Sequence, residues 1–164
     1  MNTTVLNETQ IEQKIKRIAY EILENNFEAE TLFLFGIKGN GMTLAEELSK
    51  ILRSISDQKI ISGEIIVNKQ NPLQQEIETS IDLTQIKNQT VILIDDVINS
   101  GKTMQYALIK LLEYPTKRIK TVALVDRKHR RYPIRCDYVG LTLSTTLQDR
   151  IEVNLEGVKE AYLI

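Results

Sequence analysis

The sequence predicts an α/β fold, a three-layer sandwich with a mainly parallel sheet. Short β-rich runs alternate along the chain with segments whose apolar residues recur at helical spacing, which is typical of strands that alternate with helices. Val91–Ile94 is an uninterrupted apolar run, as expected of a strand buried on both faces of a parallel sheet. The 164 residues, 42% of them hydrophobic, can bury one good core, so we expect a single domain over residues 1–164.

The first predicted element is a helix that begins beside Asn7. Asn7 can cap this helix while Gln10 reaches back to it, and Leu6 can pack onto Ile11. The apolar stripe of the helix consists of Ile11, Ile15, Ile18 and Ile22.

A strand, a turn and a second helix come next. The strand is expected over Thr31–Ile37 and the turn over residues 38–41, and Thr43 with Glu46 can form a capping box for the helix. The stripe of this helix consists of Leu44, Ala45, Leu48, Ile51 and Leu52.

The second half of the chain repeats the alternation. Gly63–Val67 offers a strand, and the polar residues 68–82 are expected to form a long loop. A helix that ends near Pro115 carries the stripe Met104, Ala107, Leu108, Leu111 and Leu112. Further strands are expected at Thr121–Val125 and Tyr138–Leu143.

Charge and cysteine content limit the class of protein. The 21 Lys and Arg residues nearly balance the 22 Asp and Glu residues, so the net charge of -1 gives no global attraction to nucleic acid or to an anionic membrane. Residues 117–135, however, hold eight Lys or Arg residues and one acidic residue, a local charge of +7. The lone Cys136 cannot form an intramolecular disulfide, and no export or membrane segment is visible, so a cytoplasmic location is expected.

The most informative stretch is IDDVINSGKT, residues 94–103. It ends on the Gly-Lys-Thr of a nucleotide-binding P-loop, but that loop needs a glycine at the position of Asp96. A carboxylate in the phosphate nest would repel a triphosphate, so we set the P-loop interpretation aside. A structural strand-to-helix turn with acidic caps is the plain alternative.

The same stretch suits a ribose 5-phosphate. A buried strand delivers Asp95 and Asp96 to its carboxyl edge, where carboxylates accept hydrogen bonds from sugar hydroxyls. The following helix offers N–H groups and the positive end of its dipole to one phosphate. Gly101 allows close approach of the backbone, and Ser100 and Thr103 add hydroxyl donors.

The run VILIDDVINSGKT resembles the phosphoribosyl pyrophosphate signature of type I phosphoribosyltransferases, with a departure at Asn99, where that family usually carries Thr, Ser, Ala or Asp. The resemblance implies that Asp95 and Asp96 are the catalytic carboxylates and bind the ribose hydroxyls. It implies that the 5-phosphate is bound by Asn99, Ser100, Gly101, Lys102 and Thr103. It also implies a small hood from the chain ends, and Mg²⁺ held mainly through the substrate, with no direct metal ligands.

A narrower resemblance covers nearly the whole chain. The run LVDRKHRRYPIRCDYVG, with RIAYEILENN, LFGIKGNGMTLAEEL and SGEI upstream, is similar to the pyrimidine-operon regulators that double as uracil phosphoribosyltransferases. The implied partners are phosphoribosyl pyrophosphate and a nucleobase, with uracil as the expected base. The resemblance also implies a homodimer or homotetramer.

Two loops depart from that family. Residues 38–41 carry Gly39-Asn40 where the regulators have Thr-Arg, so an arginine fork for pyrophosphate is missing. The expected pyrophosphate-binding residues are Lys38, Gly39, Asn40 and Gly41. The expected catalytic lid begins after Asn68, and Lys69 is its cation. The plain alternatives are a glycine turn and a mobile surface loop.

Base recognition is expected at Tyr138 and Val139. By similarity to the wider family, the aromatic ring stacks on the base and the backbone of the valine reads its edge. Residues 138–141 also fit an ordinary strand, which is the structural alternative.

The basic run from residue 127 to residue 131 raises a second class of function, an RNA-binding regulator, because Arg and Lys meet phosphates and guanidinium planes stack on bases. The candidate RNA contacts are Arg127, His129 and Arg130. Against them, Tyr20 and Lys16 replace a His and a Thr that are usual on the regulators' opening helix. A solvated charged loop is the plain alternative, so RNA ranks behind the small substrates.

A third class is a ligand sensor of the same fold, with weak or no catalysis. The altered pyrophosphate loop and the altered lid motivate it. The sequence therefore leaves enzyme, RNA-binding regulator and sensor open, with phosphoribosyl transfer to uracil as the first expectation.

Overall fold

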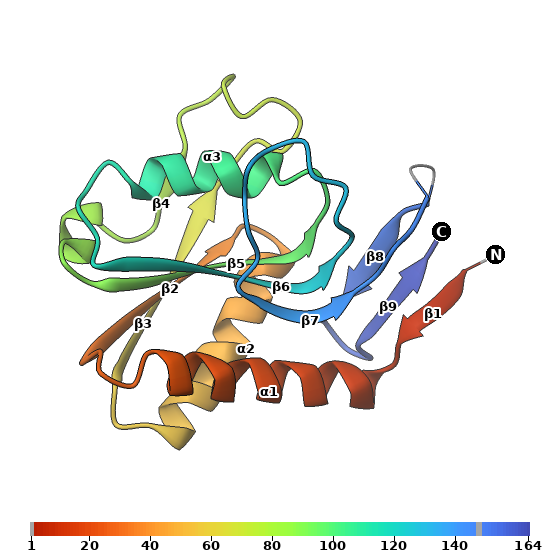
Figure 1. Ribbon diagram of the computed structural model, residues 1–164, viewed down its shortest axis with the longest axis horizontal. Helices are drawn as coiled ribbons and strands as arrows, with labels where there is room; N and C mark the ends of the chain where they lie inside the picture. The colour runs from red at the N-terminus through yellow and green to blue at the C-terminus, as the bar shows by residue number, and fades with distance from the viewer. Residues whose placement is uncertain (1, 147–148) are drawn as a thin grey trace.

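The computed structural model describes residues 2–146 and 149–164, which form two β-sheets and the helices that cover them (Figure 1). The larger sheet has the strand order β4-β3-β2-β5-β6-β7, and the smaller one has the order β1-β9-β8. The strands are β1 (Thr3–Leu6), β2 (Thr31–Ile37), β3 (Lys59–Ile66), β4 (Glu78–Thr79), β5 (Thr90–Ile98), β6 (Arg118–Asp126), β7 (Tyr138–Thr142), β8 (Ile151–Asn154) and β9 (Glu160–Leu163). The helices are α1 (Glu8–Asn25), α2 (Asn40–Ile55) and α3 (Lys102–Leu111), with a 3₁₀ turn, η1 (Leu83–Ile86).

The larger sheet is the middle of three layers, which confirms the predicted fold class. Its strands pair in parallel from β3 to β7, and only β4 pairs antiparallel. Leu32 and Leu34 of β2 pack in one core cluster with α1 and α2, whereas Phe33 and Phe35 pack in a second cluster with α3. Figure 1 shows α3 on one side of the sheet and α1 with α2 on the other.

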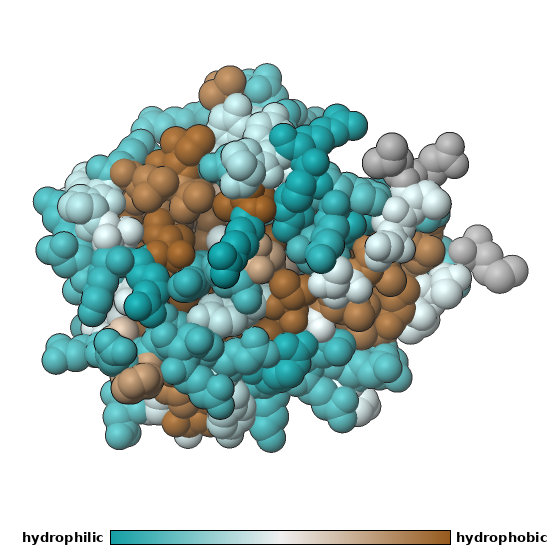
Figure 2. Space-filling view, viewed as in Figure 1, coloured by the Kyte–Doolittle hydropathy of each residue, from teal (hydrophilic) through white to brown (hydrophobic). Residues whose placement is uncertain are grey.

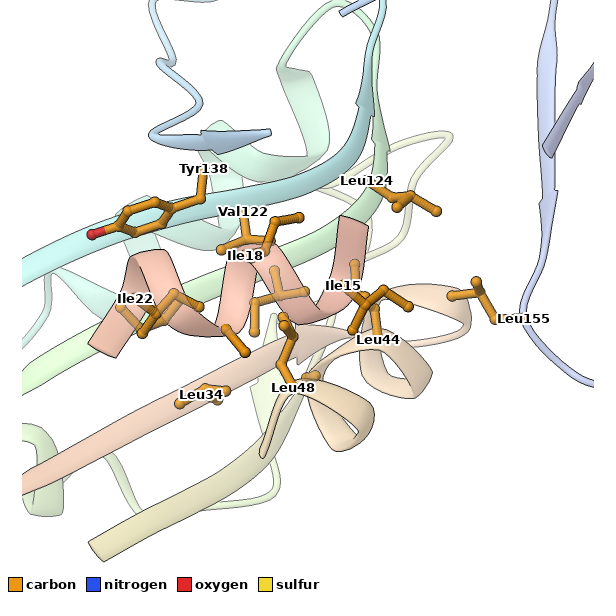
Figure 3. Packing of buried hydrophobic residues seen from close by; sticks show 14 of the residues in the cluster. Ile15, Ile18, Ile22, Leu34, Leu44, Leu48, Val122, Leu124, Tyr138 and Leu155 are labelled. Atoms are coloured by element: carbon orange, nitrogen blue, oxygen red, sulfur yellow. The ribbon is translucent and has the colours of Figure 1, made fainter. Parts of the chain in front are cut away.

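The opening helix is confirmed, including its cap. The side chain of Asn7 accepts a hydrogen bond from the Gln10 N–H, and the Gln10 side chain accepts one from the Asn7 N–H, each at 2.9 Å. The isoleucine stripe is buried, and Figure 3 shows Ile15, Ile18 and Ile22 pointing into the space between α2 and the sheet. This packing fixes α1 beneath the larger sheet.

Several element boundaries differ from the sequence prediction. Helix α2 begins at Asn40 rather than at Thr43, because Gly39 adopts a φ of 99° and serves as its N-cap without any side-chain cap. The capping box predicted for Thr43 and Glu46 is therefore wrong. Strand β5 extends to Ile98, so both aspartates of the motif lie inside the strand. The polar loop contains β4, whose two residues pair with β3.

The chain ends form the three-stranded sheet, which confirms the expected hood. Both pairings in this sheet are antiparallel, and β9 lies between the other two strands. Val153, Leu155 and Ala161 of the hood pack in the same core cluster as α1 and α2, so the hood shares a core with the larger sheet. Among the described residues, no helix has the length and apolar character needed to cross a membrane.

Candidate active site

Three of the predicted binding segments lie at the carboxyl ends of neighbouring parallel strands. Residues 38–41 follow β2, residues 99–103 follow β5, and Arg127 follows β6. These three strands are adjacent in the sheet, so their connections meet at one edge. Ligands of open α/β sheets bind at this edge, because the loops there leave a crevice outside the strand ends.

Residues 99–103, the 5-phosphate loop, line a cavity of about 110 Å³ together with Lys69 and Asp95. Gly101 has a φ of 86°, and a Cβ atom there would lie 2.2 Å from Cγ2 of Ile134, so conformation and packing both demand glycine. Gly101 is also the N-cap of α3, and it has no side chain to cap the helix. The first turn of α3 thus offers N–H groups to an anion in the cavity.

The segment after β6 packs against the outside of this loop. The backbone N–H groups of Arg131 and Tyr132 donate to the Ser100 carbonyl at 2.9 and 3.1 Å. Arg130 donates to the Asn99 carbonyl at 3.1 Å and forms a two-bond ion pair with the buried Asp126, both bonds being 2.9 Å. The basic run therefore holds the 5-phosphate loop in place.

Asp95 is buried and Asp96 is half-buried. Oδ1 of Asp95 accepts the Asp96 N–H at 2.9 Å and lies 3.7 Å from Nζ of Lys69. Burial raises the pKa of Asp95 well above its usual range, the Asp96 charge raises it further, and Lys69 opposes both effects. The predicted lid cation thus lies beside the predicted catalytic carboxylate.

The predicted pyrophosphate loop approaches β5 closely. A Cβ atom on Gly41 would lie 2.9 Å from the Ile94 carbonyl oxygen and 3.1 Å from Oδ1 of Asp95, so only glycine leaves room. Nδ2 of Asn40 donates to Oδ2 of Asp96 at 3.2 Å and to the carbonyl of Val153 in the hood at 2.7 Å. Asn40 therefore joins the loop to an aspartate and to the hood, and Lys38, the loop's cation, is exposed.

The structure does not bring Tyr138 and Val139 to this cavity. Tyr138 is buried against α1, where its hydroxyl accepts a hydrogen bond from Nδ2 of Asn26 at 3.1 Å, and Figure 3 shows its ring beside Ile22. The Val139 carbonyl accepts a bond from Arg17 at 3.1 Å. The ring has no exposed face on which a base could stack in this structure, so the stacking role expected of Tyr138 finds no support here.

The candidate RNA contacts are turned inward. Arg127 is 7% exposed, Arg130 is paired with Asp126, and Nε2 of His129 lies 2.8 Å from the Thr145 carbonyl. Lys128 and Arg131 are the exposed cations of the run. The sequence contains one signal for this arrangement, the single acidic residue Asp126 four positions before Arg130, its partner in the ion pair.

The donor set fits Mg²⁺ held mainly through a substrate. Within residues 2–146 and 149–164, no group of three or more His, Cys, Asp or Glu side chains could hold a metal ion. Asp95 and Asp96 offer carboxylate oxygens, and Mg²⁺ is typically bound by one or two carboxylates, water and substrate phosphates. Substrate oxygens would therefore have to complete the coordination.

Asp95→Asn is expected to raise thermal stability at neutral pH. A group whose pKa is higher in the folded state stabilises the fold below its unfolded pKa, and that contribution is lost as the pH rises through the folded pKa. Asp95 therefore makes the fold less stable at pH 7 than it does at low pH. The asparagine keeps an oxygen for the Asp96 N–H without the charge. The melting temperature should rise by a few degrees, at about 2–4 °C per kcal/mol for a chain of this size.

The same melting experiment carries its own control. The gain should disappear near pH 4 and below, where Asp95 is protonated in the unfolded chain as well. Asp57→Asn, which changes an exposed carboxylate, should leave the melting temperature unchanged. A melting temperature of Asp95→Asn equal to or below that of the parent at pH 7 would contradict the raised pKa.

Comparison with known proteins places this chain in a family. A family model described as "Phosphoribosyl transferase domain" matches residues 1–160. Proteins named "Bifunctional protein PyrR" are similar over nearly the whole chain: that of Staphylococcus saprophyticus is 36% identical, with 95% of this chain and 93% of the relative covered. That of Brevibacillus brevis is 37% identical, with coverages of 95% and 91%.

Solved structures show the same fold. A hypoxanthine-guanine phosphoribosyltransferase of Bacillus anthracis aligns with a TM-score of 0.71 at 21% identity, covering 86% of this chain and 82% of the other. A hypoxanthine phosphoribosyltransferase of Staphylococcus aureus aligns with a TM-score of 0.73 at 20% identity, with coverages of 88% and 79%. The chain described here belongs to the phosphoribosyltransferase family.

Proposed function

We propose that this protein transfers the ribose 5-phosphate of phosphoribosyl pyrophosphate to uracil and releases pyrophosphate. The observation that supports it is the joint position of Asp95 and the 5-phosphate loop around one cavity, beside the loop that follows β2. Sugar hydroxyls match the carboxylates, and a phosphate matches the amino end of α3. The uracil assignment comes from the similarity to the PyrR proteins.

The sheet order suggests where each part of the substrates binds. A base that displaces pyrophosphate in line at C1 must approach from the side opposite the leaving group. The pyrophosphate loop follows β2, which flanks β5 on one side, while β6 and β7 flank it on the other. The base therefore enters over the carboxyl ends of β6 and β7, rather than at Tyr138.

Asp95, Asp96 and Lys69 have separate roles in the proposed transfer. The bond from C1 to the pyrophosphate oxygen breaks as the base nitrogen bonds to C1, and positive charge builds up on the ring in the transition state. The proton of the base nitrogen passes to the departing pyrophosphate. Asp95 and Asp96 hold the ribose hydroxyls and lie where they can stabilise that charge. Asp95 and Asp96, together with substrate oxygens, would hold Mg²⁺, which would supply positive charge to the leaving pyrophosphate. Lys69 lies 3.7 Å from Asp95, so it can move from the carboxylate to the pyrophosphate when substrate enters.

Pyrophosphate release should separate this proposal from a sensor of the same fold. With Mg²⁺ and phosphoribosyl pyrophosphate, we expect uracil to support release at an enzymatic rate, and hypoxanthine, guanine and orotate to support much less. Asp95→Asn/Asp96→Asn should abolish turnover, and Asp57→Asn should not. No release with any base, while the substrate still binds, would favour the sensor. Unchanged turnover in the double variant would refute the site.

RNA binding is the second candidate function, favoured by the exposed cations Lys128 and Arg131 of the basic run and by the exposed Arg135 that follows it. If RNA is bound, these residues should supply its phosphate contacts, since Arg127 is buried. We expect the protein to retain a transcript from upstream of its own gene in about 50 mM salt and to lose it above roughly 200 mM. Arg131→Ala/Arg135→Ala should reduce retention and preserve the nucleobase transfer. No retention at low salt would eliminate this function.

We further propose that the protein forms a homodimer or homotetramer. Figure 2 shows apolar surface over α3, where Ile109 and Leu112 are 54% and 57% exposed, and Leu73 of the neighbouring loop is also exposed. Apolar surface of this kind marks protein interfaces. Light scattering should give a mass of two or four times 18.8 kDa, and Ile109→Asp/Leu112→Asp should lower it. A parent mass of 18.8 kDa would disprove the assembly.

A further inference from the structure

Arg127 is the most buried cation at the carboxyl edge of the sheet, and its side chain is fully engaged. It is 7% exposed. Its Nε donates to Oγ1 of Thr145 at 2.9 Å, and one terminal nitrogen donates to Oδ1 of Asn99 at 2.9 Å. The other terminal nitrogen donates to the carbonyls of Thr146, at 3.1 Å, and Asp149.

These bonds join two loops that are far apart in the sequence. Asn99 is the first residue of the 5-phosphate loop, and Thr145, Thr146 and Asp149 lie in the connection between β7 and β8. The side chain of His129 adds a contact of 2.8 Å to the Thr145 carbonyl. The planar fork of an arginine can hold several acceptors in fixed directions, which a lysine cannot do.

The β7–β8 connection is on the side of the sheet where the base must enter. It starts at the carboxyl end of β7, and β7 lies beyond β6 from the pyrophosphate loop. The side chain of Arg127 thus reaches from the loop expected to hold the 5-phosphate to the connection expected to border the base. None of the hydrogen bonds described above requires a positively charged donor, because their acceptors are neutral oxygens.

In the part of the chain that the structure describes, the guanidinium of Arg127 forms no close ion pair, and the oxygens that accept its hydrogen bonds are all neutral. Asp149 is the acidic neighbour: its bonds to Thr146 lower its pKa most, and the charge of Arg127 contributes further. Burying a charge without a directly paired counter-ion costs free energy. A neutral residue of similar size would avoid that cost in a merely structural role, whereas a fixed positive charge beside the 5-phosphate loop favours an anionic ligand.

We propose that Arg127 is a positioning residue that couples the nucleobase subsite to the 5-phosphate subsite. Through Asn99 it sets the 5-phosphate loop, and through Thr145 and Thr146 it sets the loop beside the base. A ligand that fills both subsites gains from the coupling, whereas a ligand that fills one does not. This inference rests on the proposed transfer to a nucleobase.

Calorimetric titration of Arg127→Lys with two ligands tests the coupling. Uridine 5-monophosphate fills both subsites, and ribose 5-phosphate fills one. The 5-phosphate loop keeps the bonds from Arg130, Arg131 and Tyr132, so affinity for ribose 5-phosphate should change little. Affinity for the nucleotide should fall roughly 5- to 150-fold, the usual range for coupled sites. In steady-state assays the KM for uracil should rise more than the KM for phosphoribosyl pyrophosphate.

Two further variants make the result specific. Asn99→Ala removes the loop's end of the link from an exposed position, so it tests the coupling even if Arg127→Lys folds poorly. Its effect on nucleotide affinity should not add to that of Arg127→Lys, because both break one link. Arg135→Lys, which makes the same exchange at an exposed side chain, should leave both affinities unchanged.

Equal losses of affinity for the two ligands would overturn the coupling, because Arg127 would then support the 5-phosphate alone. Unchanged affinities in Arg127→Lys and Asn99→Ala would also overturn it. Failure of the parent protein to bind uridine 5-monophosphate, or any other nucleoside 5-monophosphate, would instead refute the proposed function. The two failures are therefore distinguishable.

Discussion

The buried carboxylate of Asp95 is the constraint on which the site depends. Burial makes the charged form of Asp95 unfavourable, and the raised pKa of Asp95 reflects that free-energy cost. Neighbouring groups accommodate this carboxylate. Gly41 leaves room beside Oδ1, the Asp96 N–H donates to Oδ1, and Lys69 brings a positive charge within 3.7 Å. A protein that needed only stability would have an apolar residue here, so the cost points to a role in binding or chemistry.

The basic run contributes hydrogen bonds inside the protein as well as charges on its surface. As sequence it suggested a surface for RNA, but Arg127 and Arg130 turn towards the 5-phosphate loop and hold it from two directions. The ion pair of Arg130 with the buried Asp126 fixes one of them, while Arg127 bonds to neutral acceptors. The run thus gives the loop rigid support and a positive field at the same time.

Sequence reasoning succeeded where the determinants are local. The capping box at Asn7 and the strand-turn-helix order around residues 94–103 depend on neighbours within a few positions, and both could be read in advance. It is weaker where pairing decides the outcome. The strands of the hood are four residues each and join the two chain ends, so no local pattern reveals their partners, and only the family resemblance implies the hood. The position of the Tyr138 ring is of the same kind, because the face of the strand that it takes depends on packing against α1.

Asn40 lies where the similar regulators carry an arginine, so this loop lacks the positive charge of that side chain. An arginine there could reach pyrophosphate, but Asn40 instead bonds Asp96 and the hood carbonyl of Val153, which stiffens the loop without adding charge. The positive charge that a pyrophosphate requires must then come from elsewhere at the same edge. Lys38 is exposed on that loop, and Lys69 reaches the cavity from the polar loop. Lys69 lies 3.7 Å from Asp95, so a pyrophosphate that recruits Lys69 would exchange one ion pair for another, and the position of the lid would depend on occupancy of the site.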